Sequence, residues 1–269
     1  MPVLPDFSGN QPLVHSRVFV YYRVMVKKKR PRKEYRKNGI ANKKIRAMAF
    51  VDGFNLFHAL KKCDVRDRWC NIRKLINNKI EDESIILDKI WWFTAYYTKN
   101  YQAVKRHKIY AKALNSEKIQ TFLGEYNEVT KIFNKNSHKI ISVIPEDLIK
   151  NRASIPNRIE YITEEEKKTD VNIAVKIIEG AFLDLYDIAY VISGDSDLYT
   201  AVNIAKQNFK DKKFINVLPP FSKGRSMGNV CHEQITLGTR DVKEARFPDR
   251  IEFSSGEIIE IPEKYLKQE

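Results

Sequence analysis

Between residues 47 and 237, short apolar runs alternate with stretches of helical periodicity. Continuous apolar runs are typical of strands covered on both faces. Apolar residues three and four positions apart mark the buried side of a helix, and residues 169–185 show this spacing most clearly. The predicted strands are 47–51, 89–97, 118–126, 187–193 and 212–218, and the other predicted helices are 55–62, 101–114 and 198–207. We expect Asn55 to cap the first of these helices.

The order of these elements predicts an α/β fold. Alternating strands and helices favour a mostly parallel central sheet with helices on both faces. Right-handed crossover connections then bring the carboxyl ends of the strands to one edge. Ligands of such open sheets bind beyond that edge, so residues that directly follow a strand are the first candidates for a site.

Three segments differ from this body. Residues 1–46 are interpreted as a basic N-terminal arm that is too charged to form a core and therefore flexible. Residues 134–160 show little periodicity and are interpreted as an insertion or long loop, with a hairpin around residues 138–144. Residues 238–269 form a C-terminal extension, in which a hairpin turning at Ser254–Gly256 is expected.

The net charge of +14 comes mainly from the N-terminal arm. Residues 1–46 contain 13 Lys and Arg but only 2 Asp and Glu, so the rest of the chain is nearly neutral. Such an arm attracts polyphosphate by Coulomb interaction and counterion release, although a solvated tail without a partner has the same composition. Residues 18–26, VFVYYRVMV, could add a further strand.

At 43% hydrophobic and 30% charged residues, the composition is that of a soluble globular protein. The sequence contains no apolar run long enough to span a membrane and no pattern of a secretory signal. Cys63, Cys70 and Cys231 are too few for a disulfide framework and fit a reducing compartment. We therefore expect a cytoplasmic protein without a membrane partner. A homodimer is compatible with the sequence, but no heptad pattern indicates one.

Acidic residues follow two predicted strands and begin one predicted helix. Asp52 ends the first strand, and Asp195 and Asp197 follow residues 187–193. Asp170 lies in the first turn of the longest helix. Each residue alone has a simpler role as a cap or turn former. Four carboxylates at one sheet edge would repel one another without a cation, and hard oxygen ligands favour Mg²⁺ or Mn²⁺. Such an ion assists phosphodiester hydrolysis.

Three segments resemble the motifs of NYN domains, in the order of that family. They are FVDGFNLFH (50–58), KKTDVNIAV (167–175) and ISGDSDLYTAV (192–202). The similarity extends over residues 47–237, and NYN domains belong to the PIN-like nuclease superfamily, which includes LabA-like proteins. It implies a metal-dependent endoribonuclease that acts on single-stranded or structured RNA, with DNA as an alternative substrate.

The resemblance also implies roles for individual residues. The implied metal ligands are Asp52, Asp170, Asp195 and Asp197, which together with Asn55 form the catalytic set. The implied substrate-binding residues are Ser193, which would also support the acidic turn, and Arg106 and Lys167, for which a solvated charge is an equally good interpretation. Tyr97 is a candidate for stacking on a base because of its place near the end of a strand, whereas Trp91 and Trp92 are interpreted as core residues. Two positions depart from the family: Lys168 stands where a small residue is usual, and His107 where glutamine is usual. We interpret His107 as a surface residue without a role, with a contact to phosphate as the alternative.

Two other functions fit parts of the sequence. A catalytically silent RNA-binding or scaffolding protein would use the basic arm, but it would not need four acidic motif positions. A phosphatase acting on small phosphate esters also places an aspartate after a strand. Haloacid-dehalogenase-like phosphatases have a second acidic residue two positions after this aspartate. In this chain that position is Phe54, so the second acid is missing.

Overall fold

The computed structural model describes residues 44–97, 99–134, 157–253 and 255–266. They belong to one unit that begins at Lys43. The strand expected within residues 18–26, the hairpin expected around residues 138–144 and nearly all of the basic arm lie outside the described residues. Within the described part of the chain, no helix is long and apolar enough to cross a membrane.

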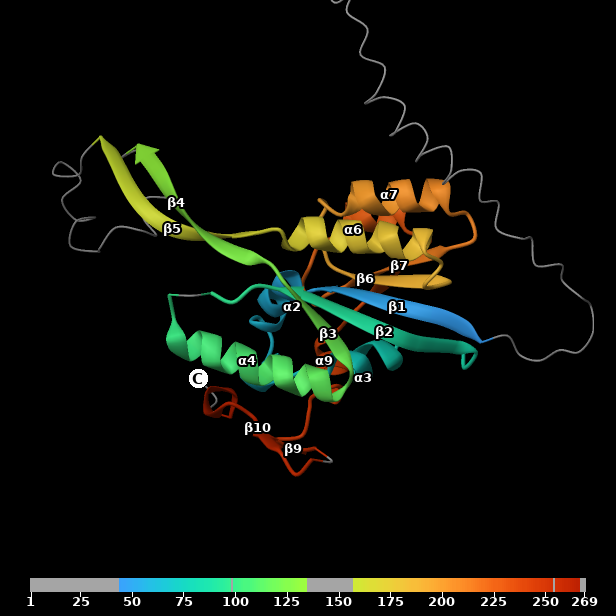
Figure 1. Ribbon diagram of the computed structural model, residues 1–269, viewed down its shortest axis with the longest axis horizontal. Coiled ribbons are helices and arrows are strands. Elements are labelled where there is room, and N and C mark those ends of the chain that lie inside the picture. Colours follow the sequence, from blue (N-terminus) through green and yellow to red (C-terminus); the bar gives the residue numbers. More distant parts are fainter. Residues whose placement is uncertain (1–43, 98, 135–156, 254, 267–269) are drawn as a thin grey trace, which may run out of the picture. The chain divides into compact units, whose positions relative to one another are not determined.

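A parallel sheet forms the centre of this unit (Figure 1). Within the described residues it has six strands in the order β3-β2-β1-β6-β7-β8, and every neighbouring pair is parallel. The predicted α/β fold with a mostly parallel sheet is therefore confirmed. The strands are β1 (Ile45–Asp52), β2 (Ile85–Thr94), β3 (Ile119–Leu123), β6 (Ile188–Ile192), β7 (Lys213–Leu218) and β8 (Glu233–Thr236).

Strand β1 is buried on both faces, as its continuous apolar run predicts. Because side chains alternate along a strand, Ala49 and Val51 belong to one core cluster, whereas Met48 and Phe50 belong to another. Helices α6 and α7 cover one face, and α3, α4 and α9 lie on the other (Figure 1). The helices are α2 (Gly53–Leu60), α3 (Ile72–Asn77), α4 (Tyr101–Ser116), α6 (Thr169–Phe182), α7 (Tyr199–Asn208), α8 (Arg225–Val230) and α9 (Thr239–Glu244).

The first helix begins earlier than the sequence pattern predicts. Asp52 is the N-cap of α2, because its carboxylate accepts a hydrogen bond from the backbone N–H of Asn55 at 2.9 Å. The prediction that Asn55 caps this helix was wrong. A helix N-cap and a strand end thus coincide at Asp52, which fixes both the carboxylate and the turn that follows β1.

The expected insertion is flanked by a β-hairpin. Strand β4 (Glu125–Asn134) pairs with β5 (Arg158–Lys167) in antiparallel register. The predicted strand 118–126 is therefore two strands, β3 and β4, which separate at Gly124. A side chain at Gly124 would collide with the Thr169 hydroxyl and the Lys167 carbonyl, each under 3 Å away. Glycine is needed there because both ends of the hairpin pass close to the start of α6.

The C-terminal extension packs into the core of the domain. It contains the predicted hairpin, formed by β9 (Arg250–Glu252) and β10 (Ile258–Glu260), and ends with the 3₁₀ turn η4 (Glu263–Tyr265). Six of its buried apolar residues belong to the core cluster that also holds Trp69: Val242, Ala245, Phe247, Ile259, Ile261 and Tyr265. The indole N–H of Trp69, which follows the 3₁₀ turn η1 (Val65–Arg68), donates to the carbonyl of Pro248 at 2.9 Å.

Candidate active site

Three of the four predicted aspartates meet at the carboxyl edge of the sheet. Asp195 and Asp197 follow β6, and Asp170 lies in the first turn of α6. One carboxylate oxygen of each lies within 4.8 Å of the other two. Asp170 and Asp195 are half-buried, and Asp197 is exposed. The parallel sheet thus brings together carboxylates that are 25 residues apart in the chain.

The fourth aspartate, Asp52, is buried at the start of α2 and does not belong to this group of three. It is only 4% exposed, and both of its carboxylate oxygens accept hydrogen bonds. Oδ1 accepts from the N–H of Asn55 and Oδ2 from the hydroxyl of Ser193, each at 2.9 Å. Burial raises the pKa of Asp52, and the charge of Asp195 raises it further, while hydrogen bonds from Asn55, Ser193 and Phe54 oppose the increase. Asp52 therefore anchors the start of α2 and the end of β6 through its hydrogen bonds, and it is not one of the three converging carboxylates.

Ser193 and Asn55 hold the loop that carries the acidic residues. The Ser193 hydroxyl accepts a hydrogen bond from the N–H of Asp195 at 3.0 Å, and Ser193 is fully buried. The side-chain oxygen of Asn55 accepts from the N–H of Gly194 at 2.9 Å. Both residues position the loop after β6. The bond to Asp195 is of the kind expected for support of the acidic turn by Ser193, and its predicted contact with substrate stays a prediction.

Asn216 on β7 has a related role that the sequence analysis missed. It is fully buried, and its amide donates to the carbonyls of Val191 and Ser193 at 3.2 and 2.8 Å. These bonds fix the end of β6 immediately before the acidic loop. The available signal was a single polar residue inside the apolar strand pattern of residues 212–218, since such a group is buried only with hydrogen-bond partners.

The electrostatics of the site favour a bound cation. Burial raises the pKa of Asp170 to about 6, and the nearby carboxylates of Asp52, Asp195, Glu166 and Asp197 contribute to the increase. A charge that is disfavoured by several like charges is stabilised by a cation between them. Three converging oxygen donors without sulfur or imidazole fit Mg²⁺ or Mn²⁺, and Asp170, Asp195 and Asp197 are the residues that would hold the ion.

The comparison with known families agrees with this arrangement. The family model of the NYN domain matches residues 46–238. The chain belongs to the NYN family. No curated protein matches it. Among solved structures, the crystal structure of a protein of unknown function from Vibrio parahaemolyticus aligns with 14% identity and a TM-score of 0.43. This alignment covers 72% of the present chain and 94% of the other, and at such values it adds nothing to the assignment.

Two departures of this NYN domain from the family pattern have structural explanations. Lys168, where a small residue is usual, has a φ of 77°, which is the left-handed conformation that glycine adopts most easily. Its ammonium group pairs with Glu125 at 2.5 Å across the base of the hairpin. His107 is partly buried rather than free on the surface. It lies 3.1 Å from the Thr94 hydroxyl, and burial lowers its pKa to about 4.

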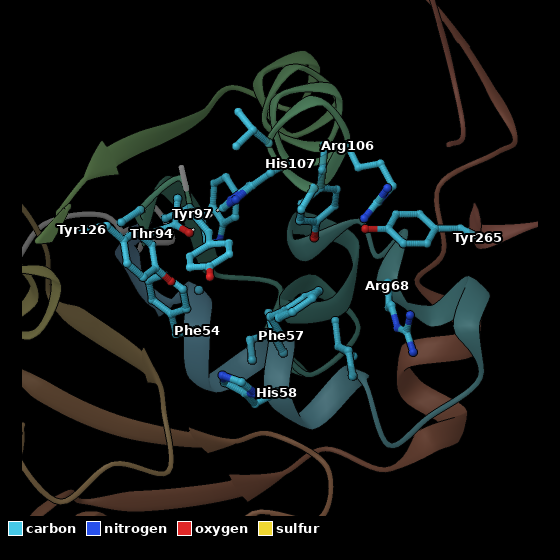
Figure 2. Close-up of a pocket in the computed structure, with 18 residues that line it drawn as sticks. Phe54, Phe57, His58, Arg68, Thr94, Tyr97, Arg106, His107, Tyr126 and Tyr265 are labelled. Atoms are coloured by element: carbon cyan, nitrogen blue, oxygen red, sulfur yellow. Dashed lines mark hydrogen bonds between the residues drawn. The ribbon is translucent and has the colours of Figure 1, made fainter. Parts of the chain in front are cut away.

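The predicted substrate-binding residues lie in different places. Lys167 is exposed and pairs with Glu165 at 2.9 Å. Arg106 and Tyr97 both line one cavity, which they share with His107 (Figure 2). Trp91 and Trp92 are 7% and 3% exposed, so their interpretation as core residues is confirmed.

Glu166, at the end of β5, is a further acidic residue near the site that the sequence analysis did not select. One of its carboxylate oxygens accepts hydrogen bonds from both the N–H and the hydroxyl of Thr169, the first residue of α6. Its charge also raises the pKa of Asp170. Glu166 is the last of three consecutive glutamates, Glu164 to Glu166. The sequence alone does not show which glutamate of such a run lies beside a site and which are solvated.

Proposed function

We propose that this NYN domain is a metal-dependent endoribonuclease that hydrolyses phosphodiester bonds of RNA with Mg²⁺ or Mn²⁺. The observation that carries the proposal is the convergence of Asp170, Asp195 and Asp197 within 4.8 Å at the carboxyl edge of the sheet. Membership of a family of PIN-like nucleases supports the same reaction class.

The residues of the chain have distinct roles in this proposal. The three converging carboxylates would hold the cation, and a bound ion would supply an activated water at neutral pH and stabilise negative charge on the phosphodiester. Asp52 is buried and joins the start of α2 to Ser193 through two hydrogen bonds. Ser193 and Asn55 are positioning residues, because they hold the loop that carries Asp195 and Asp197.

Labelled RNA incubated with the purified chain tests the proposal. With Mg²⁺ or Mn²⁺ we expect internal cleavage that stops when a chelator is added. Asp195→Asn should slow cleavage by about 100-fold or more, the usual scale for removing one charge-stabilising group from an active site. A DNA oligonucleotide of the same sequence shows whether the reaction is specific for RNA.

A matched control separates the site from general charge effects. Asp211 lies outside the acidic site and pairs with Lys212 at 2.8 Å. Asp211→Asn removes the same charge and should leave cleavage unchanged. If the wild-type chain and Asp195→Asn cut RNA equally, the proposed site is wrong.

A further inference from the structure

A cavity of about 300 Å³ lies between α2, α4 and the end of β2 (Figure 2). Its walls are mainly aromatic. Trp92 forms part of the buried wall, while Phe57 and Tyr97 are each 41% exposed. Phe54 and Tyr97 both make edge-to-face contacts with Tyr126, which also lines the cavity.

The cavity adjoins the acidic site through two connections. Gly53 lines the cavity and directly follows Asp52. Tyr126 of β4 lies opposite Glu166 of β5 in the hairpin register. The charge of Glu166 acts both on Tyr126 and on Asp170. The aromatic end of the cavity is therefore linked to the acidic site through Gly53, next to Asp52, and through Tyr126, which faces Glu166.

The opposite end of the cavity is cationic. Arg68 and Arg106 line it together with Tyr265, and Figure 2 shows the three side chains on the side away from Phe54, Tyr97 and Tyr126. Both arginines lie near enough to the Tyr265 hydroxyl to lower its pKa, although burial has the larger and opposite effect. In the described part of the chain, the buried Nε of Arg68 has no hydrogen-bond partner.

We propose that this cavity binds one nucleotide, with its base among the aromatic side chains and a phosphate group at Arg68 and Arg106. Its role as a subsite for the RNA substrate rests on the proposed function. Aromatic side chains stack on any base, and arginine binds phosphate oxygens through its planar set of N–H donors.

The size and chemistry of the cavity favour this ligand. A volume of about 300 Å³ is at the lower end of the range for small-molecule sites, which suits a single unstacked nucleotide rather than a duplex. The buried Nε–H of Arg68 has no acceptor among the described residues and would gain one from an anionic ligand, because a buried donor without a hydrogen bond is costly. The structure thus combines a surface for an aromatic ring with donors for a phosphate.

Calorimetric titration of the full chain tests this proposal. The protein carries Asp195→Asn, and a chelator prevents metal-mediated binding of phosphate at the acidic site. The ligands are the four nucleoside monophosphates in their 5′ and 3′ forms, the corresponding nucleosides, and inorganic phosphate. We expect at least one monophosphate to bind about tenfold or more tightly than its nucleoside, because only it reaches the arginines.

Variants assign the binding to the cavity. Arg106→Gln should weaken binding of the monophosphate about tenfold and leave binding of the nucleoside unchanged. Phe57→Ala should weaken the binding of both the monophosphate and the nucleoside, because it removes part of the aromatic wall. Lys105→Gln is the matched control, since Lys105 is the exposed neighbour of Arg106 on α4 and does not line this cavity. If thermal melting shows that the Arg106→Gln protein does not fold, Arg68→Gln is tested in its place.

The results distinguish failure of this inference from failure of the proposed function. Equal binding of monophosphates by Arg106→Gln and Lys105→Gln, or no binding at millimolar ligand, overturns the inference even if RNA is cleaved in an Asp195-dependent way. Phosphate-dependent binding that Arg106→Gln weakens supports the nucleotide site, even if the wild-type chain does not cleave RNA. In that case only the proposed function is wrong.

Discussion

The carboxylate of Asp170 lies in an environment that disfavours its charge. Burial and four neighbouring carboxylates raise its pKa to about 6, while its ordinary value is 3.8. A raised pKa means that the folded chain holds this proton more tightly than the unfolded chain does. The stabilisation of the folded chain by this proton is complete below about pH 4 and is lost as the pH rises through about 6. At neutral pH without metal, Asp170 therefore lowers stability.

We predict that Asp170→Asn stabilises the metal-free protein at pH 7 by roughly 1 kcal/mol, a value reduced for solvent screening of this half-exposed group. The gain should disappear near pH 4, where aspartate and asparagine are both neutral. Urea unfolding in chelator at the two pH values measures the effect. The control Asp211→Asn should lower stability at pH 7, because a hydrogen bond from Lys212 lowers the pKa of Asp211. A less stable Asp170→Asn protein at pH 7 would contradict the prediction.

At the scale of elements, the start of α2 determines where the acidic site and the cavity meet. Gly53 is the first residue of the helix after Asp52 and lies against β2. A β-carbon at this position would be 2.5 Å from the carbonyl oxygen of Phe93 and equally close to the indole nitrogen of Trp92. Only glycine lets α2 approach β2 this closely, so the carboxylate of Asp52 and the wall at Trp92 are positioned by the same contact.

Gly53→Ala should destabilise the fold by about 1–3 kcal/mol, since the backbone must move to accept the methyl group. It should also weaken metal binding, because Asp52 and Asn55 move with the helix. Gly238→Ala is the matched control. Its β-carbon would meet only Asp241 at an ordinary 3.6 Å, so stability should stay within about 0.5 kcal/mol of the wild type. Thermal unfolding of both variants measures the difference, and equal melting temperatures would refute the argument.

At the scale of the whole molecule, the C-terminal segment packs into the same core as the NYN domain, although the family match ends before this segment. The match stops at residue 238, yet Phe247, Ile259 and Ile261 belong to the main core cluster. Backbone hydrogen bonds reinforce the packing, including one from Phe247 to the carbonyl of Trp69 at 2.9 Å. Tyr265 from the same segment lines the proposed nucleotide cavity.

A chain that ends at residue 238 should therefore fail to unfold cooperatively. Burial of each large apolar side chain contributes about 1.5–3 kcal/mol, and the total from this segment is comparable with the stability of a typical domain. Phe247→Ala is a milder change that should keep the fold and cost about 3–5 kcal/mol. Circular dichroism during heating measures both. A truncated chain with an unchanged melting transition would show that the segment is dispensable.

Much of the fold was predictable because burial imposes a regular pattern on strands and helices. The continuous apolar runs predicted β1, β6 and β7, and the spacing in residues 169–185 predicted α6, although the helix ends at Phe182. The division of residues 118–126 into β3 and β4 was not predictable. It depends on a close approach between Gly124 and Thr169, which are far apart in the sequence.

For the candidate site, the local pattern of the chain was enough to identify the available carboxylates and the strand ends that carry them, because acidic residues after buried strands are local features. The packing of distant segments was needed to show that three of them converge, while Asp52 accepts hydrogen bonds from Asn55 and Ser193. It also decided that Arg68, Arg106 and Tyr265 share one cavity. Local pattern reflects whether a residue is buried, whereas the partners of a side chain depend on packing between segments that are distant in the chain.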